Sequence, residues 1–546
     1  MSTTTTAPGS PAPGGAVDLH GRSPWSVIPP LALGFFMIMV DTTIVNIAVP
    51  TLTAELDADL VSIGWVNSAY LLSYAVLLLL AGRLGDRYGP KPVFVLGLVV
   101  FTAASAWCGL AGTVEMLIVA RVVQGIGAAL MTPQTMSMIT RVFPPRGRGA
   151  AMGLWGAVAG VATITGPVLG GFLVETWGWE WIFFVNIPVG VIALVMAFTN
   201  LPRLATHKRS FDLLGVALSI IGLFAFVFGL QEGETYDWGR IGVVSVGPVD
   251  VPVTVVGLIV VGLLVLTGFV LWQHHLRDRA LLPLSLFSHR NFSLANVGGM
   301  AVSFAMIGIF FPLTIYLQTI LDLSPLHAAL LNLPGSLVSG VVAPIAGRLS
   351  DRIPGKWVVA AGFAAIAGAV VWLWAIVSPD TSPLAFLAPM ALFGVGTGAV
   401  FSPLANLATS GLDHRTAGAG AGAFNTTRQV GGVIGSAAIV AMLTARLSVT
   451  LPAAARDAAA GLPAELREPF VEGFSQAGGS FGGTMPALPP GIPDDVAQLL
   501  QDAATSAFHS GFATATGQTL LLAAGVLVVG MLAALAMDRG HHGGQP

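Results

Sequence analysis

Charged residues are scarce in this sequence. Only 9% of its 546 residues are Asp, Glu, Lys or Arg, whereas 54% are hydrophobic and the mean hydropathy is +0.81. Soluble globular domains carry about 25% charged residues, so this composition indicates a chain that crosses a membrane many times. The formal net charge of -3 gives no electrostatic support for binding nucleic acid, and no nucleic-acid partner is expected.

Several chemistries lack their characteristic residues. Cys108 is the only cysteine, which excludes an intramolecular disulfide, and its apolar surroundings favour a small packing residue. The phosphate-binding pattern G-x-x-x-x-G-K-[ST] does not occur in the sequence, so an ATP-driven motor is unsupported. No His/Cys cluster predicts a metal site, and no serine–histidine set predicts hydrolysis. The sequence therefore predicts neither an enzyme nor a cofactor.

Long apolar runs dominate the chain, and about 20 apolar residues are needed for one helical span of a membrane. Fourteen such runs predict an all-α polytopic membrane protein with 14 transmembrane helices. The expected spans are 25–49, 62–81, 92–111, 114–140, 150–174, 181–200, 213–230, 252–273, 292–318, 326–347, 357–377, 384–409, 418–446 and 516–537.

The distribution of positive charge predicts the orientation. With both termini placed in the cytoplasm, most of the 24 Lys and Arg residues fall in cytoplasmic loops. The acidic stretches "TAELDADL" and "QEGETYDWGR" fall outside. Positive residues are retained on the cytoplasmic side during insertion. We therefore expect a multi-pass protein of the cytoplasmic (inner) membrane with both termini cytoplasmic.

An internal repeat divides the chain. "GRLGDRYGPK" begins at Gly82, between the second and third spans, and "GRLSDRIPGK" begins at Gly347, between the tenth and eleventh. When the seventh and eighth spans are set aside, the two copies occupy the same place in two six-helix halves. Duplicated bundles are a transporter architecture, with the substrate site between the halves near mid-membrane.

The repeat predicts the domain organisation. Residues 447–515 are expected to form a long extracellular loop, interpreted as a lid over the outer mouth or as a disordered segment. Within it, Glu465–Phe474 and Asp494–Phe508 have the pattern of amphipathic helices. The expected segments are a disordered cytoplasmic tail (1–23), an N-terminal six-helix bundle (24–201), two additional helices with linkers (202–290), a C-terminal six-helix bundle (291–537) and a cytoplasmic tail (538–546).

Three ionisable residues lie within the expected spans: Asp41, Arg121 and Arg428. Each costs about 2.5–3.5 kcal/mol at mid-membrane, so such residues usually face a cavity or a partner. Asp41 and Arg121 are expected at similar depths below the outer membrane edge, which permits an ion pair. The pair is interpreted either as a structural salt bridge or as a proton site, in which Asp41 binds the proton and Arg121 adjusts its affinity.

Arg428 has no acidic partner in the apolar part of the second half. It is expected to bind backbone carbonyls, to contact an anionic group, or to determine the electrostatic field near Asp41. Methionine and phenylalanine side chains adapt to varied ligands, although ordinary packing also explains them. The candidate residues for a substrate cavity are Met37, Asn46, Gln124, Met131, Met136, Phe304, Met306, Asn425 and Arg428.

The repeated loop has the composition of a gate. Its glycines allow a tight backbone approach, and Arg87 and Lys91 can anchor the inner face. Asp86 can receive a helix N-terminus or an arginine from the other half. The alternative is a signal for membrane topology alone. The gating candidates are Gly82, Asp86, Arg87, Gly89, Lys91, Gly347, Asp351 and Arg352.

Glycines recur along the fifth span, in "GAVAGVATITGPVLGG". Glycines four residues apart form a smooth stripe on one helix face, so a neighbouring helix can pack closely. Proline removes a backbone donor and favours a kink. Helix packing and a moving joint both remain open as interpretations. The residues concerned are Gly156, Gly160, Gly166, Pro167, Gly170 and Gly171.

These stretches together resemble the major facilitator superfamily and, more narrowly, its fourteen-helix drug:proton antiporters. "VDTTIVNIAVP" is similar to the first-helix motif, whose aspartate is Asp41, and "GRLGDRYGPK" matches the loop motif. "RVVQGIGAA" resembles the fourth-helix motif and places its arginine at Arg121, followed by Gln124. "GPVLGG" resembles the antiporter motif, and "NTTRQVGGVIG" is similar to the thirteenth-helix stretch.

Two departures from the resemblance matter. In "WEWIFFVNIP", Glu180 takes a position where the family often has arginine, so no role of that arginine carries over. In the second loop copy, "DRIPGK", Pro354 displaces the usual glycine spacing, which predicts a weaker gate role.

The resemblance implies a proton-coupled secondary antiporter that exports amphipathic drug-like or antibiotic compounds across the cytoplasmic membrane by alternating access. The implied partners are protons, a small amphipathic substrate and the lipid bilayer, and the implied state is a monomer. An alternative is export of an endogenous metabolite, peptide or lipid by the same fold. Proton-coupled uptake and a non-transporting membrane sensor are further alternatives. "GPVLGG" disfavours uptake, and no soluble signalling domain supports a sensor.

Overall fold

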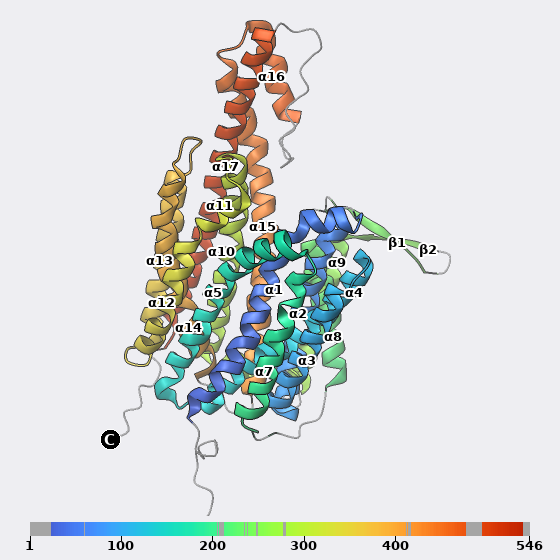
Figure 1. The fold of residues 1–546 in the computed structure, drawn as a ribbon, viewed down its shortest axis with the longest axis vertical. Helices are drawn as coiled ribbons and strands as arrows, with labels where there is room; N and C mark the ends of the chain where they lie inside the picture. The colour runs from blue at the N-terminus through green and yellow to red at the C-terminus, as the bar shows by residue number, and fades with distance from the viewer. Residues whose placement is uncertain are drawn as a thin grey trace, which may run out of the picture.

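The computed structural model describes residues 23–538 apart from 59, 205, 207–211, 234, 237, 247–248, 277–279, 411, 413–415 and 477–493. The two expected tails therefore lie almost entirely outside the described residues. Long helices, packed roughly side by side, make up most of the described chain (Figure 1).

The first half of the chain forms one bundle. Its elements are η1 (Pro24–Val27), α1 (Ile28–Glu55), α2 (Leu60–Tyr88), α3 (Pro90–Gly109), α4 (Val114–Val142), α5 (Pro145–Trp177), α6 (Trp181–Phe184) and α7 (Asn186–Asn200). Two further helices follow, α8 (Leu213–Gln231) and α9 (Val255–Leu276), with strands β1 (Arg240–Val246) and β2 (Val249–Thr254) between them.

The second half begins after a short 3-10 turn, η3 (Leu284–Ser288). Its elements are α10 (Arg290–Thr319), α11 (Pro325–Leu330), α12 (Leu333–Ser350), α13 (Gly355–Ile376), η4 (Pro383–Phe386), α14 (Leu387–Ser410), α15 (Ala417–Ala459), α16 (Ala464–Gln476) and α17 (Asp494–Ala536).

Each expected membrane span lies mostly on these helices, although the span expected at 252–273 begins in β2. Thirteen segments of the described chain are long and apolar enough to cross a membrane, and the 33-residue helix α5 covers the remaining expected span. Helices suit this setting because a lipid-embedded backbone must satisfy its own hydrogen bonds. Local signals mark several helix starts. The Thr113 hydroxyl accepts a hydrogen bond from the backbone N–H of Met116 at the start of α4, and Pro90 begins α3.

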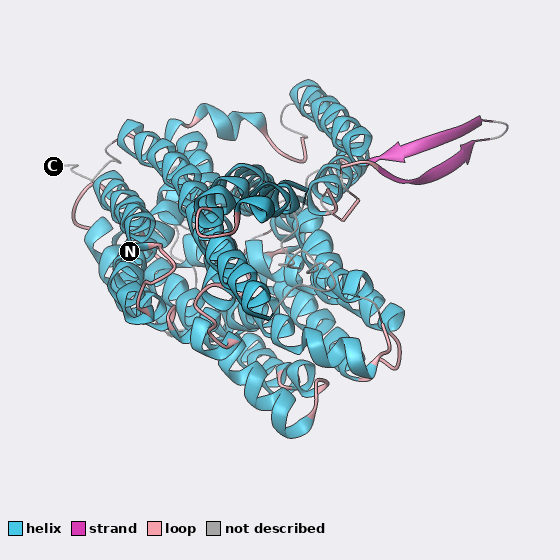
Figure 2. Ribbon diagram, turned by 90° about the horizontal axis from the view of Figure 1, so that it is seen from above, coloured by secondary structure: helices cyan, strands magenta, loops and turns pink. Residues whose placement is uncertain are grey.

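The described chain is helical, as expected, except for one short hairpin between α8 and α9 that the sequence did not predict. There, β1 and β2 pair antiparallel and project sideways from the bundle (Figure 2). Both strands are rich in valine, as in "RIGVVSV", and β-branched side chains favour extended backbone. The hairpin connects α8 and α9, which pack against each other, and α8 also packs beside α2.

Much of the stretch 447–515, interpreted from the sequence as a long extracellular loop with two amphipathic segments, is helical. Helix α15 continues to Ala459, α16 forms a separate helix, and α17 already begins at Asp494. The two predicted amphipathic segments are therefore helical. Alanine-rich sequence favours helix, and Leu462, Phe474 and Leu500 bury apolar surface within this extension. In Figure 1 it protrudes along the long axis of the molecule rather than lying across the bundles.

The two bundles meet through glycines at one end of the molecule. Helix α5 packs along α12, and α2 packs along α15. A Cβ atom on Gly149 or Gly347 would overlap the carbonyl oxygen of the other, and a Cβ on Gly82 would overlap the carbonyl oxygen of Gly418. Only residues without a side chain allow the backbones to come this close.

Replacing Gly149 by alanine should separate the bundles at this end. The added methyl group needs about 3.5 Å from its neighbours, so α5 and α12 must move apart. Spin labels on the exposed positions Tyr88 and Ile353 should then report a population at longer distances. Gly171→Ala on the same helix is the control, because open space surrounds a Cβ there. An unchanged distance distribution in Gly149→Ala would contradict this packing.

Candidate functional site

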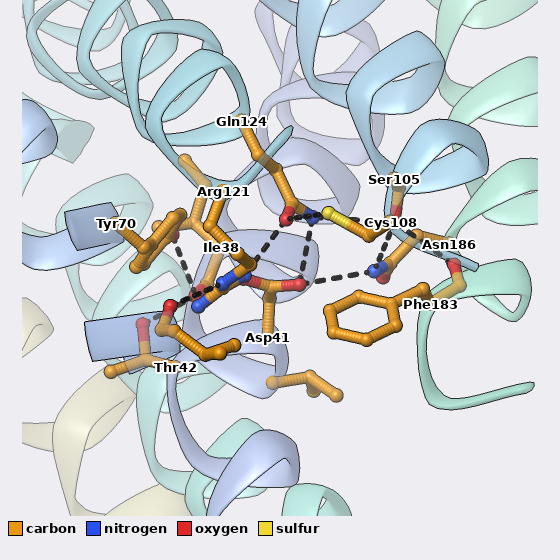
Figure 3. Close-up of polar contacts among 12 residues, drawn as sticks. Ile38, Asp41, Thr42, Tyr70, Ser105, Cys108, Arg121, Gln124, Phe183 and Asn186 are labelled. Atoms are coloured by element: carbon orange, nitrogen blue, oxygen red, sulfur yellow. Dashed lines mark hydrogen bonds and ion pairs between the residues drawn. The ribbon is translucent and has the colours of Figure 1, made fainter. Parts of the chain in front are cut away.

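A buried ion pair lies inside the first bundle. Arg121 on α4 donates from Nη1 to Oδ2 of Asp41 on α1 at 2.5 Å, and both side chains have 0% exposure (Figure 3). The structure thus brings together the two charges that the sequence placed at similar depth. A lone buried charge would be strongly unfavourable, so each depends on the other.

Two amides complete the surroundings of the Asp41 carboxylate. Gln124 donates from Nε2 to Oδ1 at 2.8 Å, and Asn186 donates from Nδ2 to the same oxygen at 3.3 Å. The Ser105 hydroxyl oxygen accepts from both amides, at 3.2 and 3.0 Å. Helices α1, α3, α4 and α7 therefore contribute to one polar network (Figure 3).

Arg121 has several partners besides Asp41. It donates from Nη1 to the Gln124 side-chain oxygen at 2.8 Å and from Nε to the backbone carbonyl of Val66 at 3.0 Å. Its guanidinium carbon lies 4.1 Å from the centre of the Tyr70 ring and 5.8 Å from that of Phe183. These contacts would hold the arginine in place if the carboxylate lost its charge.

Sequence reasoning missed most of the neutral members of this network. Gln124 was expected at a cavity wall, but Asn186, Ser105 and Tyr70 were not singled out. Cys108 was expected to be a packing residue; it is buried, and its thiol donates to the Gln124 side-chain oxygen at 3.5 Å. The only available signal was polar residues within apolar runs, such as the asparagine of "FFVNIP".

The repeated loops make reciprocal contacts between the bundles. The Asp86 carboxylate on α2 accepts hydrogen bonds from the backbone N–H groups of Gly418 and Ala419, both at 2.9 Å, at the start of α15. Asp351, after α12, accepts from the backbone N–H of Gly149 near the start of α5, at 3.1 Å. Each acid thus contacts a helix N-terminus of the opposite bundle, where the helix dipole favours negative charge.

Burial raises the pKa of Asp351, whereas the backbone donors of α5 act in the opposite direction. The second loop copy makes this contact despite Pro354, so its altered glycine spacing does not remove the contact. The other gating candidates differ in position. Arg87 lies beside the Tyr88 ring, 5.3 Å from its centre, Arg352 is exposed, and Gly89 has a positive φ of 94° at the turn into α3.

The lysines of the two loops contact their own bundles. Lys91 donates to the backbone carbonyls of Phe198 and Leu201 at the end of α7, at 2.9 and 2.6 Å. Lys356 donates to the carbonyls of Leu535 and Met537 at the end of α17, at 3.3 and 3.0 Å. A cation is favourable at a helix C-terminus, so each loop also secures the last helix of its own half.

The glycines of α5 divide into two groups. Gly156 faces Ala343 and Ser402 of the second bundle, whereas Gly166 and Gly170 face Thr43 and Ile44 of α1. Open space surrounds a Cβ at Gly171. Gly160 and Pro167 lie on α5, but their surroundings are outside the described residues. The stripe therefore serves close packing with two different neighbours.

The expected cavity residues are not gathered in one place. Met37, Met131 and Met136 are buried in the apolar core, and Met306 is packed against that core. The backbone of Phe304 packs against Gly435, and the side chain of Asn46 is outside the described residues. Asn425 reaches the first bundle, because its Nδ2 lies 3.9 Å from the Met136 sulfur. Arg428 contacts Asn425 one helical turn away.

Two helical bundles joined by reciprocal loops, with a buried ion pair inside one of them, define a membrane transporter rather than an enzyme. The profile of the Major Facilitator Superfamily matches residues 31–436. The chain belongs to this superfamily and is a multi-pass protein of the cytoplasmic membrane.

Relatives within the superfamily carry varied names. The chain is 46% identical to the uncharacterized transporter Rv1250 of Mycobacterium tuberculosis, over 78% of this chain and 72% of the relative. It is 32% identical to the tetracenomycin C resistance and export protein of Streptomyces glaucescens, over 79% and 78%. It is 29% identical to the riboflavin transporter RibZ of Clostridioides difficile, over 76% and 87%.

The fold also matches a solved transporter structure. The proton:xylose symporter XylE aligns with a TM-score of 0.55 and 14% sequence identity, covering 92% of this chain and 94% of the symporter. At this identity the match concerns the fold alone.

Asp86→Asn should weaken the contact between α2 and α15. The asparagine presents an NH2 group to one of two backbone donors, so one hydrogen bond and the charge–dipole attraction are lost. The expected cost is about 1–3 kcal/mol, measured as a lower melting temperature of the purified protein. Asp538→Asn is the control, because its ion pair with Arg290 is exposed and should contribute little. Equal melting temperatures for the two variants would contradict a stabilising role of Asp86.

Proposed function

We propose that this chain is a proton-coupled secondary antiporter that exports amphipathic drug-like or antibiotic compounds by alternating access, working as a monomer. The observation that carries the proposal is the Asp41 carboxylate, which is fully buried yet contacted by Arg121, Gln124 and Asn186. Burying a titratable group inside a membrane bundle costs free energy, so such a group usually has a function. Proton transfer is a common one.

In this proposal, Asp41 exchanges its proton as the bundles move. Removing one partner of a buried ion pair usually costs about 3–5 kcal/mol, because the other charge is left alone. Here Arg121 would keep its contacts with Gln124, Val66 and Tyr70 when Asp41 becomes neutral. These contacts lower the cost of protonation. A proton crossing the membrane supplies about 2.3 kcal/mol per 100 mV, enough to drive export against a gradient.

The reciprocal loops would act as the cytoplasmic gate. Positive charge near Gly82 and Gly347 supports a cytoplasmic location for this end of the molecule. In the structure the bundles meet there through Asp86 and Asp351. Opening toward the cytoplasm would require both acids to leave their helix N-termini. The proposed gate consists of Gly82, Asp86, Arg87, Gly89, Lys91, Gly347, Asp351 and Arg352.

The export direction and cargo class rest on resemblance. The stretch "GPVLGG" on α5 resembles the antiporter motif, and the name of the Streptomyces relative describes tetracenomycin C resistance and export. A relative of similar identity is named a riboflavin transporter, which favours a second candidate: the same fold moving a specific metabolite. Transport of a chemically broad panel in proteoliposomes with an imposed pH gradient separates these two functions.

Asp41→Asn should abolish transport driven by a pH gradient while leaving the protein folded. Asparagine is nearly isosteric with aspartate but does not bind a proton in this range. Proteoliposomes containing the variant should show substrate flux that is insensitive to the imposed gradient, with an unchanged elution profile of the purified protein. Asp212→Asn, at the start of α8 and outside the network, is the control. Normal pH-driven flux in Asp41→Asn would rule out the proton role.

Arg121→Lys tests the coupling partner. Lysine keeps the positive charge but loses the planar fork that contacts Asp41, Gln124 and Val66 together. We expect about a tenfold loss of proton-coupled flux, comparable to one or two lost hydrogen bonds, with normal membrane insertion. Proton uptake per transported molecule, measured with a pH-sensitive dye, gives the coupling directly. Wild-type coupling in this variant would argue that Arg121 only fastens α1 to α4.

A further inference from the structure

Arg428 is a partly buried cation that pairs with no acidic side chain in the ion pairs of the described residues. Among the described residues, Arg121 pairs with Asp41 and Arg290 pairs with Asp538. The first of these is buried and the second is exposed, and Arg428 takes part in neither. A buried guanidinium cannot lose its proton to escape the cost of burial. Because Arg428 is partly withdrawn from solvent, an anionic partner during part of the protein's working cycle would offset this cost.

The contacts that Arg428 does make are weak or neutral. Its Nη2 lies 3.5 Å from the side-chain oxygen of Asn425, well beyond the usual hydrogen-bond distance. It interacts with the hydroxyl of Tyr74, and its guanidinium carbon lies 5.8 Å from the centre of the Phe401 ring. Its Nε is buried and has no hydrogen-bond partner among the described residues. A planar donor fork of this kind matches the two oxygens of a carboxylate.

The surroundings of Arg428 come from both bundles. Tyr74 lies on α2 of the first bundle, whereas Phe401 and Arg428 lie on α14 and α15 of the second. Asn425 faces the sulfur of Met136 on α4. The space between the halves of a duplicated transporter is where a substrate is bound. Aromatic rings and a thioether beside the cation provide apolar contact for an aromatic body.

We propose that Arg428 binds an anionic group of the transported molecule, and that the preferred substrates are aromatic carboxylates. This inference deepens the proposed function and rests on its assumption that a substrate binds between the bundles. The carboxylate would pair with the guanidinium, and the aromatic body would lie against Tyr74, Phe401 and Met136. Without the substrate, the arginine keeps only its weak contacts with Asn425 and Tyr74.

A row of side chains connects this subsite with the proton site. The ring of Tyr74 lies nearly parallel to that of Tyr70, with centres 6.2 Å apart and an angle of 8°. Tyr70 in turn lies against the guanidinium of Arg121, which binds Asp41. A substrate that draws Arg428 and Tyr74 toward itself therefore acts on the neighbours of the proton-binding carboxylate. Substrate and proton binding are thereby linked through direct contacts.

Binding of matched probes to the purified protein in nanodiscs tests the subsite. Naphthoate carries the anion, and naphthamide has nearly the same shape without the charge. The wild-type protein should bind naphthoate at least about tenfold more tightly, because burying an unpaired charge on either partner costs affinity. Arg428→Gln should remove this preference, and Arg428→Lys should retain part of it. Arg290→Gln, which removes an exposed cation, is the matched control and should bind like the wild type.

Two results would overturn the proposal. One is equal or undetectable binding of the two probes by the wild-type protein, a measurement that needs no variant to fold. The other is a folded Arg428→Gln protein that keeps its preference for naphthoate. Asp41→Asn separates this inference from the proposed function, because it should lose proton-driven flux and still prefer naphthoate. Intact proton coupling in Asp41→Asn would instead rule out the proton role of Asp41 in the proposed function, whatever the probes show.

Discussion

The ion pair between Asp41 and Arg121 constrains the first bundle more than any other contact. Neither charge is stable in an apolar interior alone, so the helices that carry them must stay together. The pair also needs Gln124 and Asn186 to satisfy the second carboxylate oxygen. Helices distant in the sequence are thus held in one arrangement by polar groups, while the apolar surface around them contacts lipid or other helices.

In each of the duplicated loops, an acidic residue and a lysine contact different bundles. The acid contacts the opposite bundle through backbone N–H groups, and the lysine contacts the last helix of its own bundle through backbone carbonyls. Because both partners are main-chain groups, the contacts depend on helix position rather than on the identity of partner side chains. The glycines at Gly149 and Gly418 allow the acid to reach the helix N-termini.

The sequence predicted the features that carry a large energetic cost. Membrane spans require long apolar runs, and a charge within one is conspicuous, so the helices and the residues Asp41, Arg121 and Arg428 were found. Asn186 and Ser105 were not predicted as site residues, because neutral polar residues are common in such helices. Only the fold brings these two next to Asp41. The valine-rich hairpin was not predicted, because apolar residues alone do not distinguish a β-strand from part of a membrane-spanning helix. In the extension, the two amphipathic segments were predicted as helices, whereas the continuation of α15 to Ala459 was not, because Pro452, Arg456 and Asp457 are typical of loop sequence.

Helix α15 joins three of these features in one continuous rod. Its 43 residues correspond to a length of about 65 Å, more than a bilayer thickness. It begins against Asp86, carries Arg428 about three turns later, and ends in the extension with α16 and α17. A small tilt of its first turn therefore displaces the far end of the helix by a larger distance. A molecule that binds the far end of α15 would favour one position of its first turn, which lies on the other side of the membrane.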